Sequence, residues 1–123
     1  LSKVKLHCGD SSVTVTSAGR VIRIYTEDIL YICLAKRGCS IYVARQGEID
    51  EIHCKESLGD LYERLAGRGF EYAHNSYIVN LKYVKKLCSE ELKLVDGQVL
   101  SVSRTKIKNL RKQVTEYFER KHR

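Results

Sequence analysis

The sequence of 123 residues contains neither methionine nor proline. Because methionine is missing even from position 1, we expect the chain to be a fragment of a longer protein. No low-complexity segment, internal repeat or break in composition marks a linker. A chain of this length can bury a core without metal or disulfide support, so we predict one domain over residues 1–123.

Long apolar runs are also missing. No stretch approaches the ~18 residues that a membrane-spanning helix requires, and no amino-terminal segment has the order of a secretory signal. The cysteines are odd in number and include no Cys-x-x-Cys pair, which disfavours a disulfide framework or a zinc site. We therefore predict a cytoplasmic protein without membrane contact, in which Cys33 and Cys54 are small core residues. The five cysteines are Cys8, Cys33, Cys39, Cys54 and Cys88.

The patterns that catalysis requires are absent as well. The sequence has no glycine-rich phosphate loop, no paired-carboxylate motif and no cluster of metal ligands. Cys39 and His74 could be imagined as a thiol nucleophile and its base, but their sequence positions do not establish their separation in space. We predict that the protein is not an enzyme and uses no cofactor.

Charge is present, and it is unevenly placed within a net charge of +7. Residues 101–123 hold eight basic and two acidic side chains, whereas residues 48–63 hold six acidic side chains and Lys55 alone as a base. Clustered lysine and arginine supply the salt-dependent part of nucleic-acid binding, so the basic end predicts a polyanion partner. The alternative for a basic terminal helix is an ordinary solvated face.

Short strand patterns dominate the first half of the chain. Turn residues separate the segments, among them Gly19, the 36–38 segment and Gly47. Thr26–Asp28 is expected to form a short helical turn before a buried strand. Together these patterns predict a meander of antiparallel strands at 4–8, 12–17, 20–25, 29–34, 39–45 and 48–55.

Two segments have helical spacing instead. The first lies between Ser57, a suitable N-cap, and Gly67, a suitable C-terminal stop. The second covers residues 103–122 and is amphipathic, and Asp96-Gly97 marks a hairpin before it. Because strands and helices do not alternate, we predict a mostly β fold, an antiparallel sheet or sandwich arrangement with one central and one C-terminal helix. The apolar positions are Leu58, Leu61, Tyr62 and Leu65 in the first helix and Ile107, Leu110, Val114, Tyr117 and Phe118 in the second.

The segment FEYAHNSYIVNLKYV, residues 70–84, interrupts a strand pattern with three polar side chains. Aromatic and β-branched residues alternate on both sides of His74, Asn75 and Ser76, which have weak strand preference. We expect these three residues to lie at a loop or strand edge that the flanking strands hold in place. Binding residues on a short loop with a rigid scaffold lose little entropy on binding.

The longer segment RGFEYAHNSYIVNLKYVKKL, followed by LVDGQVLSVSRTKIKNLRK, resembles the LytTR DNA-binding domain family. That family commonly shows an aromatic-x-x-x-His-x-Ser motif ending in Val-Asn, then an Asn/Asp-Gly hairpin, then a Val-Ser-Arg segment that opens the last helix. TEDILYICLAKRGCSIYV is similar to the family's upstream strand, loop and strand, so the resemblance covers about residues 11–119.

This resemblance implies an elongated, mostly β fold that reads major-groove bases of double-stranded promoter DNA through loops. It further implies the output domain of a bacterial response regulator in a two-component system, with a receiver or sensor domain in cis. A second copy of the chain is implied as a partner on direct repeats.

Three places match the family's base-reading positions. They are the 36–40 loop, with Arg37 and Cys39 as candidates, then Asn75, then Arg104. The residue types fit, because an asparagine amide pairs with adenine N6 and N7, and arginine pairs with guanine O6 and N7 or with a phosphate. The alternatives are a turn-capping role for Asn75 and a solvated charge for Arg104.

Further polar and basic side chains near these positions are candidates for phosphate contacts. Among them Ser103 could equally be the N-cap of the last helix. We expect Asn80 to organise a turn and the acidic 48–63 stretch to face away from DNA. The rival hypothesis is a protein-interaction module that uses the basic helix and has no DNA sequence preference. The candidates for phosphate contacts are Lys36, His74, Ser76, Ser103, Lys106 and Lys108.

Overall fold

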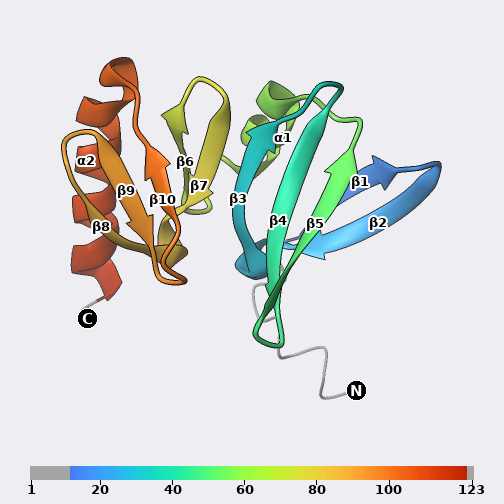
Figure 1. Ribbon diagram of the computed structural model, residues 1–123, viewed down its shortest axis with the longest axis horizontal. Coiled ribbons are helices and arrows are strands. Elements are labelled where there is room, and N and C mark those ends of the chain that lie inside the picture. The colour runs from blue at the N-terminus through green and yellow to red at the C-terminus, as the bar shows by residue number, and fades with distance from the viewer. Residues whose placement is uncertain (1–11, 122–123) are drawn as a thin grey trace.

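A five-stranded antiparallel sheet forms the centre of the computed structural model, which describes residues 12–121. Its strand order is β5-β4-β3-β7-β6 (Figure 1). The chain meanders from β3 to β5, passes through a helix, and returns as the β6–β7 hairpin beside β3. The strands are β3 (Ile29–Leu34), β4 (Cys39–Arg45), β5 (Glu48–Cys54), β6 (Phe70–His74) and β7 (Tyr77–Asn80).

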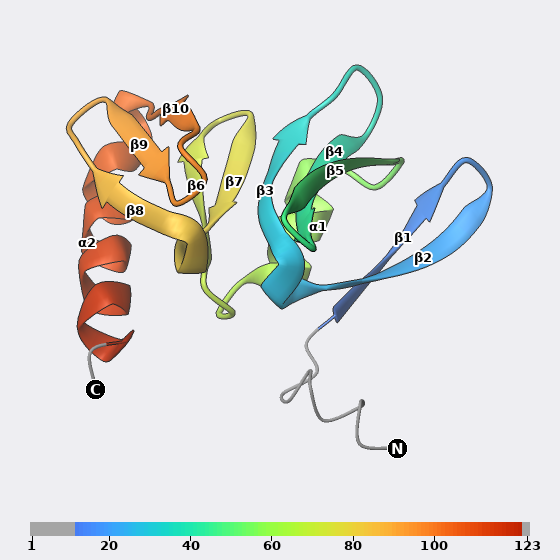
Figure 2. The ribbon, with the colours of Figure 1, turned by 60° about the horizontal axis from the view of Figure 1, so that its bottom comes forward.

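Two smaller antiparallel sheets flank the centre. A hairpin of β1 and β2 projects beyond the β5 side, and a three-stranded sheet in the order β10-β9-β8 lies toward the other end, with helix α2 packed against it (Figures 1 and 2). The mostly β fold with two helices is therefore confirmed, and the predicted strand at 4–8 lies outside the described residues. The remaining elements are β1 (Ser12–Ser17), β2 (Arg20–Tyr25), β8 (Val84–Leu87), β9 (Glu91–Leu94), β10 (Val99–Ser101), α1 (Leu58–Leu65), α2 (Arg104–Lys121) and the short 3-10 helices η2 (Thr26–Asp28) and η3 (Leu81–Tyr83).

The predicted turns are also present. Ala18 and Gly19 join β1 to β2 with φ values of 51° and 80°, the positive values that a tight hairpin turn requires and that glycine adopts without cost. Asp96 and Gly97 lie in the β9–β10 connection, where the Gln98 N–H donates to the Asp96 Oδ1 (3.1 Å). These turns determine the strand registers on either side of them.

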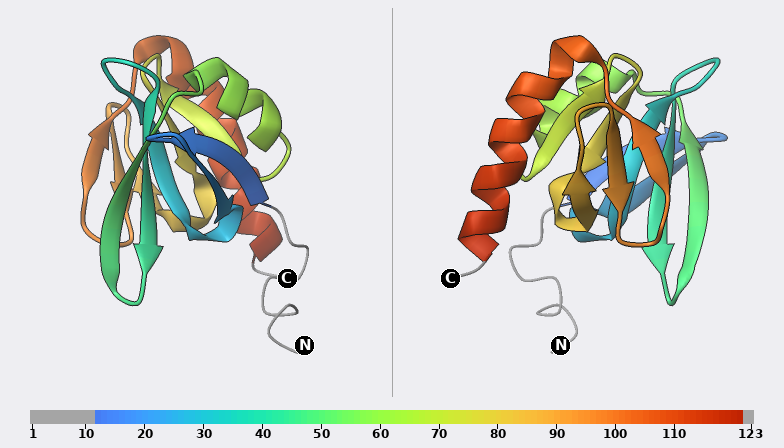
Figure 3. Two further views of the ribbon diagram at one scale, coloured as in Figure 1. Left: turned by 90° about the vertical axis from the view of Figure 1, so that its right-hand side faces the viewer. Right: turned by 60° about the vertical axis from the view of Figure 1, so that its left-hand side comes forward.

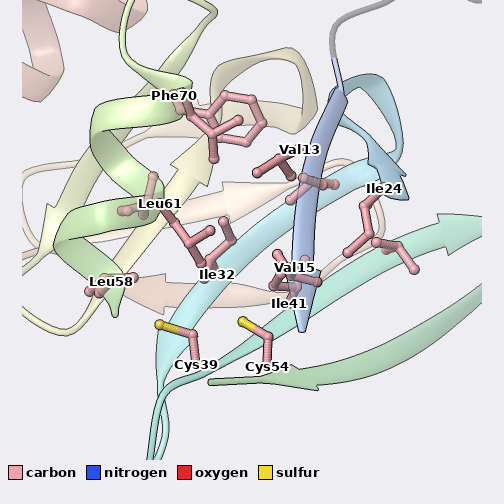
Figure 4. Close-up of a cluster of buried hydrophobic side chains, with 14 residues drawn as sticks. Val13, Val15, Ile24, Ile32, Cys39, Ile41, Cys54, Leu58, Leu61 and Phe70 are labelled. Atoms are coloured by element: carbon pink, nitrogen blue, oxygen red, sulfur yellow. The ribbon is translucent and has the colours of Figure 1, made fainter. Parts of the chain in front are cut away.

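Each face of the central sheet covers a separate apolar core. The first core lies between this sheet, the β1–β2 hairpin and α1, and includes Ile32, Ile41 and Phe70 (Figure 4). The second lies between β6, β7, the three-stranded sheet and α2, and includes Val79, Leu92 and Leu110. Because successive strand residues point to opposite faces, β3 contributes to both cores.

The ends of the elements show which polar residues are structural. The Ser57 Oγ accepts the Asp60 N–H (3.1 Å), which confirms Ser57 as the N-cap of α1. Asn80 is only 4% exposed. Its amide donates to the carbonyl oxygens of Thr26 (3.2 Å) and Ile29 (2.8 Å), and its Oδ1 accepts the Lys82 N–H (3.0 Å). Asn80 therefore organises the η3 turn, as predicted.

Candidate nucleic-acid interface

Three segments that are distant in the sequence meet along one edge of the molecule. They are the β3–β4 loop, the β6–β7 turn and the start of α2, all at the top of Figure 1 and of both views in Figure 3. The Leu34 N–H donates to the Ser76 carbonyl oxygen (2.7 Å), and the Ser103 N–H donates to the Ala73 carbonyl oxygen (2.9 Å). The β6–β7 turn is therefore joined to both neighbours by main-chain hydrogen bonds.

The β6–β7 turn consists of Asn75 and Ser76, where sequence reasoning expected a loop or strand edge. His74 precedes the turn and stacks on the ring of Tyr77, with 5.1 Å between ring centroids. Asn75 is exposed, and its side chain makes no hydrogen bond to any residue that the structure describes. Its amide is therefore free to pair with a ligand.

Hydrogen bonds also determine which ring nitrogen of His74 carries the proton in the neutral imidazole. The Ser76 N–H donates to His74 Nδ1 (3.2 Å), and an N–H group can only donate. In the neutral imidazole the proton therefore lies on Nε2, since one ring nitrogen accepts and the other donates. The Ser76 hydroxyl lies 2.9 Å from the same Nδ1. Nε2–H is left as a donor, the group that a phosphate oxygen requires.

The start of α2 lies directly beside this turn. The Ser103 carbonyl oxygen accepts the N–H groups of Lys106 (3.0 Å) and Ile107 (3.1 Å), so Ser103 occupies the N-cap position. Its hydroxyl shares a hydrogen bond with the Thr105 hydroxyl (3.2 Å). Arg104 is exposed at the first helical position, where unpaired N–H groups favour an anion.

The two lysines of the first turns of α2 differ in their surroundings. Lys106 lies over the ring of Tyr72, with its Nζ 5.0 Å from the ring centroid, and is partly buried. This cation–π contact holds its charge against β6, next to the turn. Lys108 lies two residues further along the helix and is exposed.

The β3–β4 loop is held by its own backbone. Gly38 has φ of 74°, and a Cβ at this position would lie 2.0 Å from the Cys54 carbonyl oxygen. The His53 Nε2–H donates to the Arg37 carbonyl oxygen (2.6 Å), and the Ala35 N–H donates to the Gly38 carbonyl oxygen (3.1 Å). The exposed side chains of Lys36 and Arg37 therefore stand on a loop with a defined conformation.

Cys39 does not join them. It is fully buried at the start of β4, opposite Cys54 on β5, and its thiol points into the first core (Figure 4). Burial raises the pKa of the Cys39 thiol to about 12, so the group is neutral at physiological pH. The side chain cannot reach a base from this position, and it lacks the thiolate that a nucleophile requires.

One contact at this edge was not anticipated from the sequence. The Tyr77 hydroxyl donates to the Ser101 carbonyl oxygen and lies 3.1 Å from the Ser101 hydroxyl. It connects β7 to the end of β10, immediately before α2. No local pattern signals such a bond, because the partners are 24 residues apart and belong to different sheets.

The acidic side chains of β5 begin at the end of the strand that is distant from this edge. Glu48 follows the β4–β5 turn at the bottom of Figure 1, away from the edge that holds Asn75. Glu51 accepts a hydrogen bond from the Ser40 hydroxyl (2.7 Å). Within residues 12–121 no group of three or more His, Cys, Asp or Glu side chains could hold a metal ion. No helix in the same range is long and apolar enough to cross a membrane.

This edge thus presents an amide, guanidinium groups and ammonium groups on two loops and on the start of α2, the composition of a surface that contacts nucleic acid. The chain belongs to the LytTr DNA-binding domain family, whose model matches residues 19–115. It is a DNA-binding domain of that family.

Among solved structures, the chain is similar to the LytTr DNA-binding domain of a protein described as a methyl-accepting/DNA response regulator from Bacillus cereus. The two share 24% sequence identity with a TM-score of 0.64, over 85% of this chain and 96% of that one. At this identity the likeness establishes the fold alone. Among curated proteins, no sequence matches the chain.

Proposed function

We propose that the domain binds double-stranded DNA in a sequence-specific manner, with base contacts from three segments of the upper edge. Arg37, Asn75 and Arg104 read bases in the major groove. The observation that carries the proposal is the pair of main-chain hydrogen bonds that join these segments on either side of the β6–β7 turn. Fixed separations between reading side chains are what sequence readout requires.

The side-chain chemistry supports this division of roles. The free amide of Asn75 can donate and accept at once, as pairing with adenine N6 and N7 requires. The guanidinium groups of Arg37 and Arg104 match guanine O6 and N7. Around them, the phosphate contacts come from Lys36, His74, Ser76, Ser103, Lys106 and Lys108.

In the cell, we infer that the domain is the output part of a bacterial transcriptional regulator in the cytoplasm. The Bacillus cereus protein with the similar fold is described as a response regulator, which supports a receiver or sensor domain in cis. We further propose that two copies of the chain bind side by side on direct repeats of promoter DNA. The proposed function includes no catalytic step and no cofactor.

Fluorescence anisotropy tests the proposal. Wild type, Asn75→Ala and Arg104→Ala are titrated against a duplex selected from a random pool and a scrambled duplex, at two salt concentrations. The matched control is Arg45→Ala, which removes an exposed arginine at the end of β4, away from the reading edge. Each base contact is worth about 1–3 kcal/mol of discrimination, so both reading variants lose about 5- to 150-fold of the preference for the selected duplex.

The rival hypothesis predicts a different result. If wild type binds both duplexes alike, and Asn75→Ala and Arg104→Ala behave as Arg45→Ala does, the basic helix serves an acidic protein partner instead.

A further inference from the structure

Lys55 is an anomaly in the sequence, because it is the one basic residue among the six acidic side chains of residues 48–63. The structure places it directly after β5, where that strand ends near the upper edge of the molecule (Figure 1). Its side chain is exposed. Lys55, in the middle of this acidic stretch, therefore lies near the edge of the molecule that holds the β3–β4 loop.

Backbone contacts connect Lys55 to the β3–β4 loop on one side. A Cβ on Gly38 would lie 2.8 Å from the Cα of Lys55, so the two backbones are packed directly against each other. The loop that carries Lys36 and Arg37 and the residue Lys55 therefore form one continuous surface.

On its other side, Lys55 is connected to the β1–β2 hairpin. The Lys55 N–H donates to the Thr16 carbonyl oxygen (3.1 Å). Thr16 is the next-to-last residue of β1, and Arg20 opens β2 after the tight turn at Ala18 and Gly19. Arg20 is exposed, and Figures 1 and 2 show the turn as the outermost point of the molecule on this side.

The carboxylate of Glu56, the residue after Lys55, is bound to the backbone of β1 and not to Lys55 or Arg20. Glu56 accepts the Thr16 N–H with both carboxylate oxygens (3.0 and 3.2 Å). Burial alone would raise the pKa of Glu56, but the hydrogen bonds from Thr16 hold it below its usual value. Glu56 is thus ionised and directed at the β1 backbone. Neither Lys55 nor Arg20 forms an ion pair with any residue of the 12–121 range.

We propose that Lys55 and Arg20 form a further phosphate-binding site, through which the β1–β2 hairpin contacts the DNA backbone beyond the three reading segments. The ligand is the phosphate backbone of double-stranded DNA, on the flank that lies past the β3–β4 loop. The site is continuous with the surface of the proposed function and rests on that function for its orientation on DNA. Its contribution is affinity and footprint length, because phosphate contacts carry no sequence information.

Counterion release gives the expected size of the effect. Each neutralised phosphate contributes about 0.9 to the slope of log K against log salt. Lys55→Gln and Arg20→Gln therefore each lower this slope by about 1 and weaken binding about eightfold at 0.1 M salt. Selected and scrambled duplexes lose the same factor, so the preference between them is unchanged.

The experiment measures binding of wild type, Lys55→Gln and Arg20→Gln by anisotropy over a salt series. The matched controls are Arg45→Gln and Lys86→Gln, at exposed basic residues elsewhere on the surface. Duplexes are shortened from one end at a time. Removal of one flank of the duplex, and not of the other, abolishes the difference in affinity between wild type and Lys55→Gln. Lys55→Arg, which keeps the positive charge, binds as wild type does.

Two results overturn the inference. One is a salt slope for Lys55→Gln and Arg20→Gln equal to that of Arg45→Gln and Lys86→Gln. The other is a loss that persists on duplexes lacking either flank. Failure of the proposed function gives a different result, because wild type then shows no preference for the selected duplex. In that event a lowered slope of log K against log salt for Lys55→Gln still supports the phosphate site.

Discussion

Strand β7 has an asparagine next to each of its ends, and the two have opposite surroundings. Asn75 lies in the turn before the strand, exposed and without a hydrogen bond to the described part of the chain. Asn80 ends the strand, buried, with three hydrogen bonds to the backbone. The same type of side chain therefore organises the fold at one end of the strand and is free to bind a ligand at the other.

Burial, rather than residue type, accounts for the different hydrogen bonding of the two asparagines. Buried polar groups need partners within the protein, because losing water without replacement costs free energy. An exposed amide on a rigid turn has no such cost, and its hydrogen-bonding groups stay available to a ligand. Substitutions at the two ends should consequently affect different measurements.

The largest effect is expected for Asn80→Ala. The change leaves the Ile29 carbonyl oxygen and the Lys82 N–H without their partner, so the free energy of unfolding should fall by about 2–4 kcal/mol. Urea denaturation measures it. The preference for a selected duplex should persist in the folded fraction, and a loss of preference without a loss of stability would contradict the scaffold role.

Asn75→Ala is the matched variant at the other end. We expect its free energy of unfolding to stay within about 0.5 kcal/mol of wild type, as at other exposed sites, while discrimination between duplexes falls by about 1–3 kcal/mol. Denaturation and anisotropy are measured on the same protein preparation. Destabilisation comparable to that of Asn80→Ala would show that Asn75 is a turn-capping residue instead.

A smaller effect is expected for Tyr77→Phe, which removes the hydroxyl that connects β7 to Ser101. Because Ser101 is exposed and water can replace the bond, stability should fall by about 1 kcal/mol or less. The start of α2 loses one anchor to the reading turn, so the preference that depends on Arg104 should weaken more than the preference that depends on Asn75. A double-mutant cycle with Arg104→Ala measures this coupling, and a coupling energy of zero would argue against the anchoring role.

The smallest effect concerns pH. The pKa of Glu56 is lowered in the folded protein, so its hydrogen bonds to Thr16 stabilise the fold above the usual pKa of a glutamate, and this contribution is lost as pH falls through the lowered value. Wild type should exceed Glu56→Gln in unfolding free energy at pH 7, and the difference should shrink as the pH falls below the usual pKa of a glutamate. Glu48→Gln, at an exposed carboxylate, is the control, and a difference independent of pH would reject the mechanism.

Much of the scaffold was predictable, because it depends on local signals. The alternation in β1 to β5, the N-cap Ser57 and the hairpin at Asp96-Gly97 all follow from neighbouring residues. The turn at Asn75 and Ser76 was equally visible, since polar side chains interrupt strand formers there. Local chemistry was therefore sufficient for the elements and for part of the candidate site.

The remaining features depend on packing between distant segments. Asn80 was expected to organise a turn, but its bonds reach residues 54 and 51 positions away. The burial of Cys39 had a usable signal, since Cys39, Ile41 and Val43 alternate on one face of β4. The prediction that Cys39 reads bases depended on its position in the 36–40 loop and did not include this alternation.

The main-chain hydrogen bonds on either side of the β6–β7 turn have a consequence for how such a domain changes its target. Because these bonds involve only backbone atoms, exchanging the side chains at positions 37, 75 and 104 leaves the spacing between the three proposed base-reading positions unchanged. Under the proposed function, new base preferences can therefore arise by substitution, in evolution or in the laboratory, on a backbone that keeps the same span along the duplex.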